Sequence, residues 1–304
     1  MKKIKNFLII TIFLYIILQL LLNNKLIQNS IYFSYTLFLK NVFPNLFPFL
    51  VISNILINYG FVEICLSLFN SIMKKAFKIN GASSFVFIMS LLTGFPSSAK
   101  YTKELYEKNI INELEATKIL MFTHFSNPLF VVGTISIFLN YKIAFIILIV
   151  HYLGNIIIGL IFRNFFISDK SDNYKSINKI DSFGNCFSKS IINSIDTLLL
   201  IFGTMTFFLT ITCIIQNILN LNPLNHALLS GLFEFTQGLK YISLLNINVK
   251  IKAVLMEMMI SFGGISVHMQ VMGIISNTKI KYQPFLIARL LHSTITGLLI
   301  YLLI

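Results

Sequence analysis

The stretch SLLTGFPSSAKY, residues 90–101, places Gly94, Pro96 and then Lys100 at the end of a long uncharged run. A helix that meets glycine and proline at such a depth must break or kink, because proline lacks the backbone donor and clashes with the preceding turn. Broken backbone within a membrane is tolerated only where it is buried in protein or lines a wet cavity. The stretch therefore predicts an interrupted membrane helix with a ligand site beside it.

A similar stretch of sequence occurs further along the chain. A constant shift of 140 residues produces identities without a gap, among them Ser90 with Ser230, Phe95 with Phe235, Lys100 with Lys240, Tyr101 with Tyr241, Ser126 with Ser266, and Gly133 with Gly273. A sequence composed mostly of a few apolar residue types gives more chance identities, but a single offset that yields this many identities is not expected by chance. We therefore predict that the chain consists of two related halves.

Composition indicates a membrane protein. Of the 304 residues, 56% are hydrophobic and 12% are charged, and the mean hydropathy is +0.81. The net charge of +13 comes from lysines that stand singly beside apolar runs, which is typical of membrane flanks and disfavours nucleic-acid binding. We predict an all-α polytopic protein embedded in a lipid bilayer, because stretches free of Asp, Glu, Lys and Arg run over residues 119–141, 143–162, 197–233 and 258–278.

Four segments follow from the charges and the apolar runs. Residues 1–30 have three lysines among the first five positions, then an apolar run without a small-x-small cleavage site, which predicts an uncleaved signal anchor with a cytoplasmic N-terminus. Residues 31–163 and 190–304 are the two expected repeats, and residues 164–189 form the expected polar linker. Three cysteines without CxxC spacing predict no disulfide framework, no metal site and no cofactor.

Polar side chains inside apolar segments supply the candidate site, because such groups are costly in a membrane and usually mark a path or a pocket. For a single serine or threonine there is a simpler explanation, a hydroxyl bonded to the carbonyl one turn earlier in its own helix. Glu234, His268 and Arg289 need partners instead. The candidate substrate-binding residues are Gly94, Pro96, Ser97, Ser98, Lys100, Ser126, Asn127, Glu234, Thr236, Gly263, Gly264, Ser266, His268, Gln270 and Arg289.

A second break is predicted at SFGGISVH, residues 261–268. The paired glycines Gly263 and Gly264 leave backbone N–H groups open, and a half-helix that begins there would present them to an anion. The alternative is that both glycines only permit close helix contact. No nucleophile elbow, HExxH motif or paired-carboxylate spacing occurs, so we expect no enzyme activity.

Charged groups near the two breaks suggest how an anion would be held and driven. Lys100, Lys240 and Arg289 are the available counter-charges, and we expect Lys100 and Arg289 to face one shared cavity. Glu234 and His268 are the candidates for carrying coupling protons, since histidine titrates near neutral pH. The coupling ion (H⁺ or Na⁺), the direction of movement and a homo-oligomeric state are left open.

Several stretches resemble a known family, the sporulation integral membrane proteins of the YlbJ type, which belong to the nucleoside-recognition (gate) domain group. At two positions the chain departs from that pattern: Ser98 stands where the family has glycine, and His124 where a small amide or hydroxyl residue is typical. The stretches that carry the resemblance are LFPFLVIS (46–53), GFPSSAK (94–100), HYLGN (151–155), EFTQG (234–238), SFGGISVHMQ (261–270) and ARLLH (288–292).

The resemblance implies a fold and a function. It implies two gate-like repeats with interrupted helices, and we expect these repeats to have inverted topology. It also implies a role in endospore formation, in which dipicolinic acid moves from the mother cell across the outer forespore membrane towards the developing spore. The alternatives are a transporter of nucleosides or another small metabolite, and a non-transporting membrane assembly or signalling factor.

Overall fold

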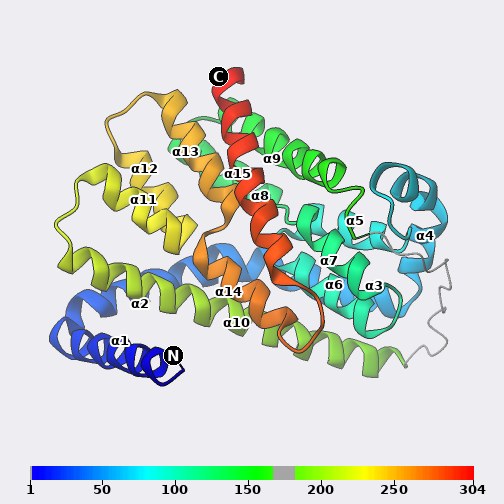
Figure 1. Cartoon of the computed structure of the whole chain (residues 1–304), viewed down its shortest axis with the longest axis horizontal. Helices are drawn as coiled ribbons and strands as arrows, with labels where there is room; N and C mark the ends of the chain where they lie inside the picture. Colours follow the sequence, from blue (N-terminus) through cyan, green and yellow to red (C-terminus); the bar gives the residue numbers. More distant parts are fainter. Residues whose placement is uncertain (1, 167–181) are drawn as a thin grey trace.

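The structure, a computed structural model, describes residues 2–166 and 182–304 (Figure 1). It is 84% helical, with no strand among those residues, and six of its described helical segments are long and apolar enough to cross a membrane. The prediction of an all-α polytopic membrane protein is confirmed. The six segments are Lys3–Leu22, Asn24–Asn58, Tyr141–Ile161, Phe183–Ile218, Val249–Ile275 and Tyr282–Leu303, with shorter apolar helices at Ser83–Thr93 and Pro128–Phe138.

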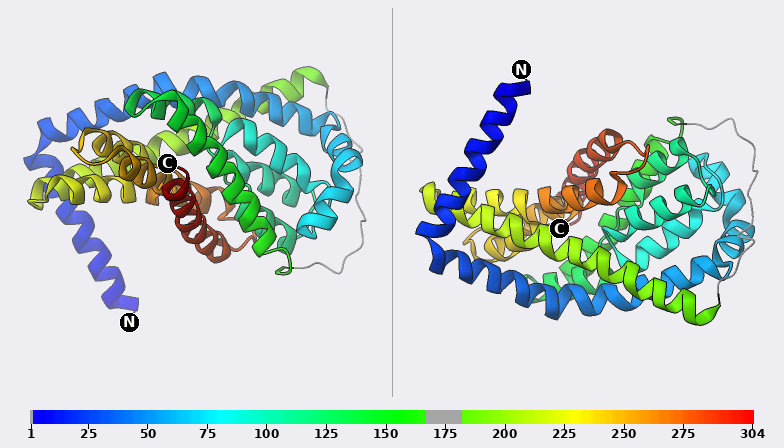
Figure 2. Two further views of the ribbon diagram at one scale, coloured as in Figure 1. Left: turned by 90° about the horizontal axis from the view of Figure 1, so that it is seen from above. Right: turned by 90° about the horizontal axis from the view of Figure 1, so that it is seen from below.

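The N-terminal helices lie along the outside of the molecule. Helix α1 (Lys2–Leu22) projects away from the rest in both views of Figure 2, and its apolar side chains are exposed, as expected of a helix that faces lipid. A turn at Asn23 leads directly into α2, so the second apolar segment begins before the expected boundary at residue 30. The elements that follow are α2 (Asn24–Leu37), the π-helical segment η1 (Phe38–Val42), α3 (Phe43–Asn58), α4 (Phe61–Ile72) and the π-helical segment η2 (Met73–Phe77).

The remainder consists of two sets of five helices. A long helix, α10 (Phe183–Ile218), lies between the two sets in the sequence, and in space it runs alongside α2 and α3. Both ends of α11 lie 140 residues after the ends of α5, and α13 ends 140 residues after α7, which is the offset found in the sequence. The first set is α5 (Ser83–Thr93), α6 (Ser97–Glu107), α7 (Glu113–Phe122), α8 (Pro128–Phe138) and α9 (Tyr141–Ile161). The second set is α11 (Pro223–Phe233), α12 (Phe235–Leu244), α13 (Val249–Phe262), α14 (Gly264–Ile275) and α15 (Tyr282–Leu303).

Each set contains two interrupted helices. The first is broken between α5 and α6, where Gly94 has φ of 77°, and again between α7 and α8 over residues 123–127. The second is broken at Glu234, between α11 and α12, and between α13 and α14, where Gly263 and Gly264 have φ of 88° and 72°. Positive φ favours glycine because it lacks a Cβ. The breaks predicted at residues 94–96 and 263–264 are therefore present.

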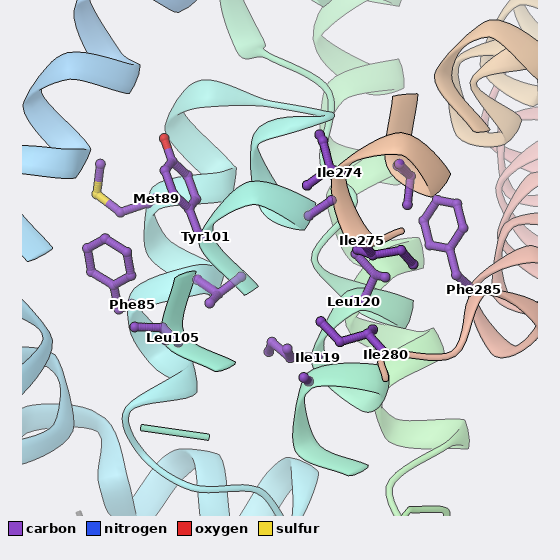
Figure 3. Packing of buried hydrophobic residues seen from close by; sticks show 14 of the residues in the cluster. Phe85, Met89, Tyr101, Leu105, Ile119, Leu120, Ile274, Ile275, Ile280 and Phe285 are labelled. Atoms are coloured by element: carbon purple, nitrogen blue, oxygen red, sulfur yellow. The ribbon is translucent and has the colours of Figure 1, made fainter. Parts of the chain in front are cut away.

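Apolar side chains from distant segments fill the core between the two sets. Phe85 and Tyr101 from the first set and Phe285 from α15 are fully buried in one cluster, which Figure 3 shows from close by. Residues 167–181 of the predicted polar linker lie outside the described residues, whereas α10 already begins at Phe183, inside the expected linker range. The packed core places the four breaks side by side.

Candidate functional site

A cavity that is partly open to the surroundings lies where the breaks converge, and its empty space, the open part included, is about 590 Å³. Its walls come from η1 and α3, from α10, from three of the breaks and from the start of α14. The polar residues that line it are Asn41, Asn45, Ser126, Asn127, Glu234, Thr236 and Gln270, and the aromatic ones are Phe95, Phe130 and Phe235.

Backbone and amide groups hold the two breaks of the first set together. The backbone N–H of Phe95 donates to the carbonyl of Phe125 over 2.7 Å. The side-chain amide of Asn127 donates to the carbonyls of Leu92 and Thr93, at 3.1 and 3.3 Å, and its oxygen caps α8. All the hydrogen-bonding capacity of this amide is thus used to fix the cavity wall.

The two breaks of the second set are joined by a carboxylate. Oε1 of Glu234 accepts hydrogen bonds from the backbone N–H and the hydroxyl of Thr236, at 3.2 and 2.8 Å, and so caps α12. Its Oε2 accepts a hydrogen bond from the hydroxyl of Ser266 on α14. Gly264 brings α14 close, because a Cβ there would lie 3.1 Å from the backbone nitrogen of Phe235 and 3.2 Å from the carbonyl oxygen of Gly231.

Among the residues that line the cavity, Gln270 presents a buried amide that a ligand could bind. It is only 3% exposed, and its side-chain amide forms no hydrogen bond among the described residues. An amide offers both a donor and an acceptor, so it can bind a carboxylate, a carbonyl or a ring nitrogen. Three phenylalanine rings in the wall supply flat apolar surface for a planar solute.

The structure brings together six of the fifteen predicted site residues as cavity lining: Pro96, Ser126, Asn127, Glu234, Thr236 and Gln270. Four others, Gly94, Gly263, Gly264 and Ser266, form or fasten the breaks behind that wall. Ser97 and Ser98 are buried at the start of α6, and their hydroxyls have no hydrogen-bond partner among the described residues. Metal ligation finds no support, since no group of three or more His, Cys, Asp or Glu in the described ranges could hold an ion.

The two expected counter-charges do not meet, contrary to the expectation of one shared cavity. Lys100 lines a different cavity, between α6, α10 and α14, where its ammonium donates to the carbonyl of Asn193 over 2.8 Å. Arg289 is fully buried and belongs to the lining of neither cavity. The third expected cation, Lys240, lies over the ring of Phe33 at 4.8 Å. Helix packing turned these three side chains in different directions.

Arg289 on α15 belongs to a buried polar network with groups from α7, α9 and α15. Its guanidinium donates to the carbonyl of Met121 at 2.6 Å, to Oδ1 of Asn155 at 3.0 Å and to Nδ1 of His292 at 3.0 Å. The carbonyls at the end of a helix attract a cation, and Met121 lies in the last turn of α7. These bonds give Arg289 a role in joining the two sets of helices.

His268 and His124 occupy the space behind the breaks. Nε2 of His268 donates to the carbonyl of Phe262 over 3.0 Å, so its Nδ1 accepts from the hydroxyl of Tyr282, 2.8 Å away. The ring of His124 stacks on Phe95 with 4.5 Å between centroids, and neither of its nitrogens has a hydrogen-bond partner among the described residues. Both histidines are buried.

Sequence reasoning missed some of the lining. Asn41 and Asn45 on η1 and α3 bring amides to the cavity, and the rule applied elsewhere, that polar groups in an apolar segment mark a pocket, would have found them. Phe130, Ile201 and Met205 also line it, but nothing distinguishes them in the sequence from other apolar residues.

Comparison with known proteins places this arrangement in a class. Residues 39–163, which include the first two breaks, match the family described as "Gate: Nucleoside recognition". Over an alignment of 343 positions, the chain is 28% identical to "Sporulation integral membrane protein YlbJ" of Bacillus subtilis (strain 168), and the alignment covers 100% of this chain and 84% of that protein. The predicted resemblance is confirmed as a similarity of residues 39–163 to the gate family and of the whole chain to this sporulation protein, and the chain is a multi-pass integral membrane protein. No solved structure matches it.

Proposed function

We propose that this protein is a transporter that carries a small planar solute through the cavity between its broken helices, without chemically converting it. The single observation that carries the proposal is the convergence of three breaks and α14 on one cavity with an amide, Gln270, facing into it. Broken helices in membrane carriers line binding sites because their freed backbone groups must be satisfied there. Movement of one set of helices against the other would open the cavity to either side in turn.

The first candidate for the solute is dipicolinic acid, moved from the mother cell across the outer forespore membrane during sporulation. Support comes from the similarity to a protein whose name assigns it to sporulation. Further support comes from Gln270, whose amide can donate to a carboxylate, and from the phenylalanine rings that can flank an aromatic ring.

A nucleoside is the second candidate, and the charge of the cavity favours it. Glu234 is the one ionisable side chain among the residues that line the cavity, and Lys and Arg are missing from that lining. A dianion without a cation in contact is costly to bury, whereas a neutral heterocycle is not. The match of residues 39–163 to a nucleoside-recognition family is in accord with this alternative.

Uptake into proteoliposomes that contain the purified protein tests the proposal. We expect saturable uptake of labelled dipicolinate, and uptake of labelled uridine, measured in parallel, separates the two candidates. The variant Gln270→Leu should lower uptake at least about tenfold while leaving thermal stability unchanged, because it removes a ligand-facing amide that forms no hydrogen bond among the described residues. Met269→Leu, an exposed change at the neighbouring position, is the matched control. Absence of saturable uptake for both solutes would reject transport in favour of an assembly role.

A further inference from the structure

Behind the cavity wall lies a buried acid and histidine pair that the proposed function does not use. Nδ1 of His151 on α9 is 3.2 Å from Oε1 of Glu257 on α13, and both side chains are 0% exposed. Ser261 donates from its hydroxyl to the same carboxylate oxygen and lies 3.2 Å from the same ring nitrogen. The second oxygen of Glu257 has no hydrogen-bond partner among the described residues.

The other ring nitrogen of His151 contacts the cavity wall directly. The backbone N–H of Ser126 donates to Nε2 of His151 over 3.0 Å, and Ser126 lines the solute cavity. Because an N–H only donates, Nε2 carries a lone pair, and the ring proton is on Nδ1, facing Glu257. The imidazole is therefore neutral in this conformation, with one nitrogen holding the break between α7 and α8.

A second proton on His151 would alter this break. It would bind at Nε2, turn that acceptor into a donor, and set two N–H groups against each other at Ser126. The carboxylate of Glu257 would then stabilise the imidazolium, because an opposite charge within about 4–6 Å favours the charged form. Protonation of His151 therefore removes the hydrogen bond that holds Ser126 at this break.

We propose that His151 and Glu257 form the proton-binding site that couples proton movement to the solute cavity, through the hydrogen bond from Ser126 N–H to His151 Nε2. The proposal rests on the cavity being the transport site. The coupling residues lie outside the cavity. The solute contacts the break at Ser126 from the cavity side, and the proton acts on the same break from behind, at His151. Loss of the hydrogen bond from Ser126 to His151 would let the cavity wall move at the break between α7 and α8, next to Asn127.

The charged surroundings of His151 come from each neighbouring element. Helix α15 contributes His292, whose Nε2 donates to the His151 carbonyl over 3.0 Å, and Arg289, whose guanidinium donates to the other His292 nitrogen. His124 follows α7 nearby, and Lys118 of α7 is turned away to the carbonyl of Arg163, 2.6 Å from its ammonium. Helix α8 carries no titratable side chain, and Lys74 and Lys75 of η2 lie towards the far end of α9. Glu257 is the acid that faces the ring.

A cysteine reporter tests the coupling without any solute. In a Cys213→Ser background, Phe130→Cys places a thiol in the cavity wall, and an uncharged thiosulfonate reagent measures its accessibility between pH ~5 and ~8, which brackets histidine titration. Rates are normalised to Glu107→Cys, a half-exposed position outside the cavity, to remove the pH dependence of the thiol itself. We expect the normalised rate to rise at least about fivefold as the pH falls and His151 gains its proton.

Three variants decide the assignment. His151→Gln keeps an acceptor for Ser126 but takes no proton, and should abolish the pH dependence. Glu257→Gln keeps the hydrogen-bond acceptor but removes the charge that faces the imidazolium, and should weaken the pH dependence. His226→Gln, a histidine outside the network, should behave as the wild-type protein does.

The outcomes are separable. A flat profile in the wild-type protein, or an unchanged profile in His151→Gln, overturns the proton site. If His151→Gln does not insert, a Glu257→Gln profile identical to that of the wild-type protein overturns it equally. Because the readout contains no solute, failure of dipicolinate or uridine uptake leaves this result standing, and the two proposals can fail independently.

Discussion

The two pairs of breaks share a layout and differ in chemistry. The first pair is joined by a backbone hydrogen bond from Phe95 to Phe125 and by the amide of Asn127. The second pair is joined by the carboxylate of Glu234, which accepts from Ser266. The first junction therefore contains neutral groups only, and its charged group, Glu257, lies behind it beside His151, whereas the second junction contains its charged group itself. The comparison teaches that the same architecture can place an acid either within a junction or behind it.

The largest effect is expected at the tighter of the two glycine breaks. At Gly94, with φ of 77°, a Cβ would lie 2.9 Å from the Cα of Asn127, so Gly94→Ala should cost more than about 3 kcal/mol from backbone strain and overlap. At Gly264, where the nearest atoms are 3.1 Å away, alanine should cost about 1–3 kcal/mol. Thermal unfolding in detergent measures both.

Gly133→Ala is the control for these glycines, because a Cβ there meets nothing within 4 Å. Equal losses of stability for Gly94→Ala and Gly264→Ala would show that close packing at the breaks does not determine which substitution costs more. A loss for Gly133→Ala as large as either would show the same.

An amide cannot be replaced by an acid in the first pair. Asn127→Asp loses the two donors to the carbonyls of Leu92 and Thr93 and sets a carboxylate against them, so we expect a loss of about 1–3 kcal/mol in unfolding free energy. Asn140→Asp, at a helix cap outside the breaks, is the matched control and should be nearly neutral, because the side-chain oxygen that caps α9 is kept. A stable Asn127→Asp protein would contradict the view that this wall is fixed by its donors.

The acid in the second pair should be replaceable for folding but not for transport. Glu234→Gln keeps an acceptor for Thr236 and removes the charge, so stability should change by less than about 1 kcal/mol, within the range of one hydrogen bond. Uptake in proteoliposomes should nevertheless fall at least about tenfold if this junction responds to charge during transport. Unchanged uptake at normal protein levels would show that the charge of Glu234 has no part in transport.

The smallest effect is expected for labels that report topology. If the two sets of helices are inverted repeats, the end of α6 and the end of α12 lie on opposite sides of the membrane. Single cysteines at Glu107 and Leu244, both exposed, should leave uptake unchanged and should react with a membrane-impermeant reagent from opposite sides of sealed vesicles. Labelling of both from one side would mean that the repeats are parallel.

The sequence by itself determined the class of protein and two of its breaks. Long apolar runs without charges predicted an all-α membrane protein, because such a run is stable in lipid and a helix satisfies its backbone hydrogen bonds within its own segment. Gly94 with Pro96, and Gly263 with Gly264, predicted interruptions because these residues act on the backbone of their own segment. The offset of 140 residues is a property of the sequence alone, and the bounds of α5 and α11 and the ends of α7 and α13 follow it.

Only the tertiary structure decided which polar groups meet. Lys100 and Arg289 are both costly to bury, and the sequence assigned them to one cavity, but packing placed one beside α10 and the other among carbonyls and a histidine. His151 and Glu257 stand 106 residues apart, and no local pattern indicates that their side chains touch. The direction of a side chain on a helix depends on how that helix rotates against its neighbours, and this rotation is fixed by the whole core at once.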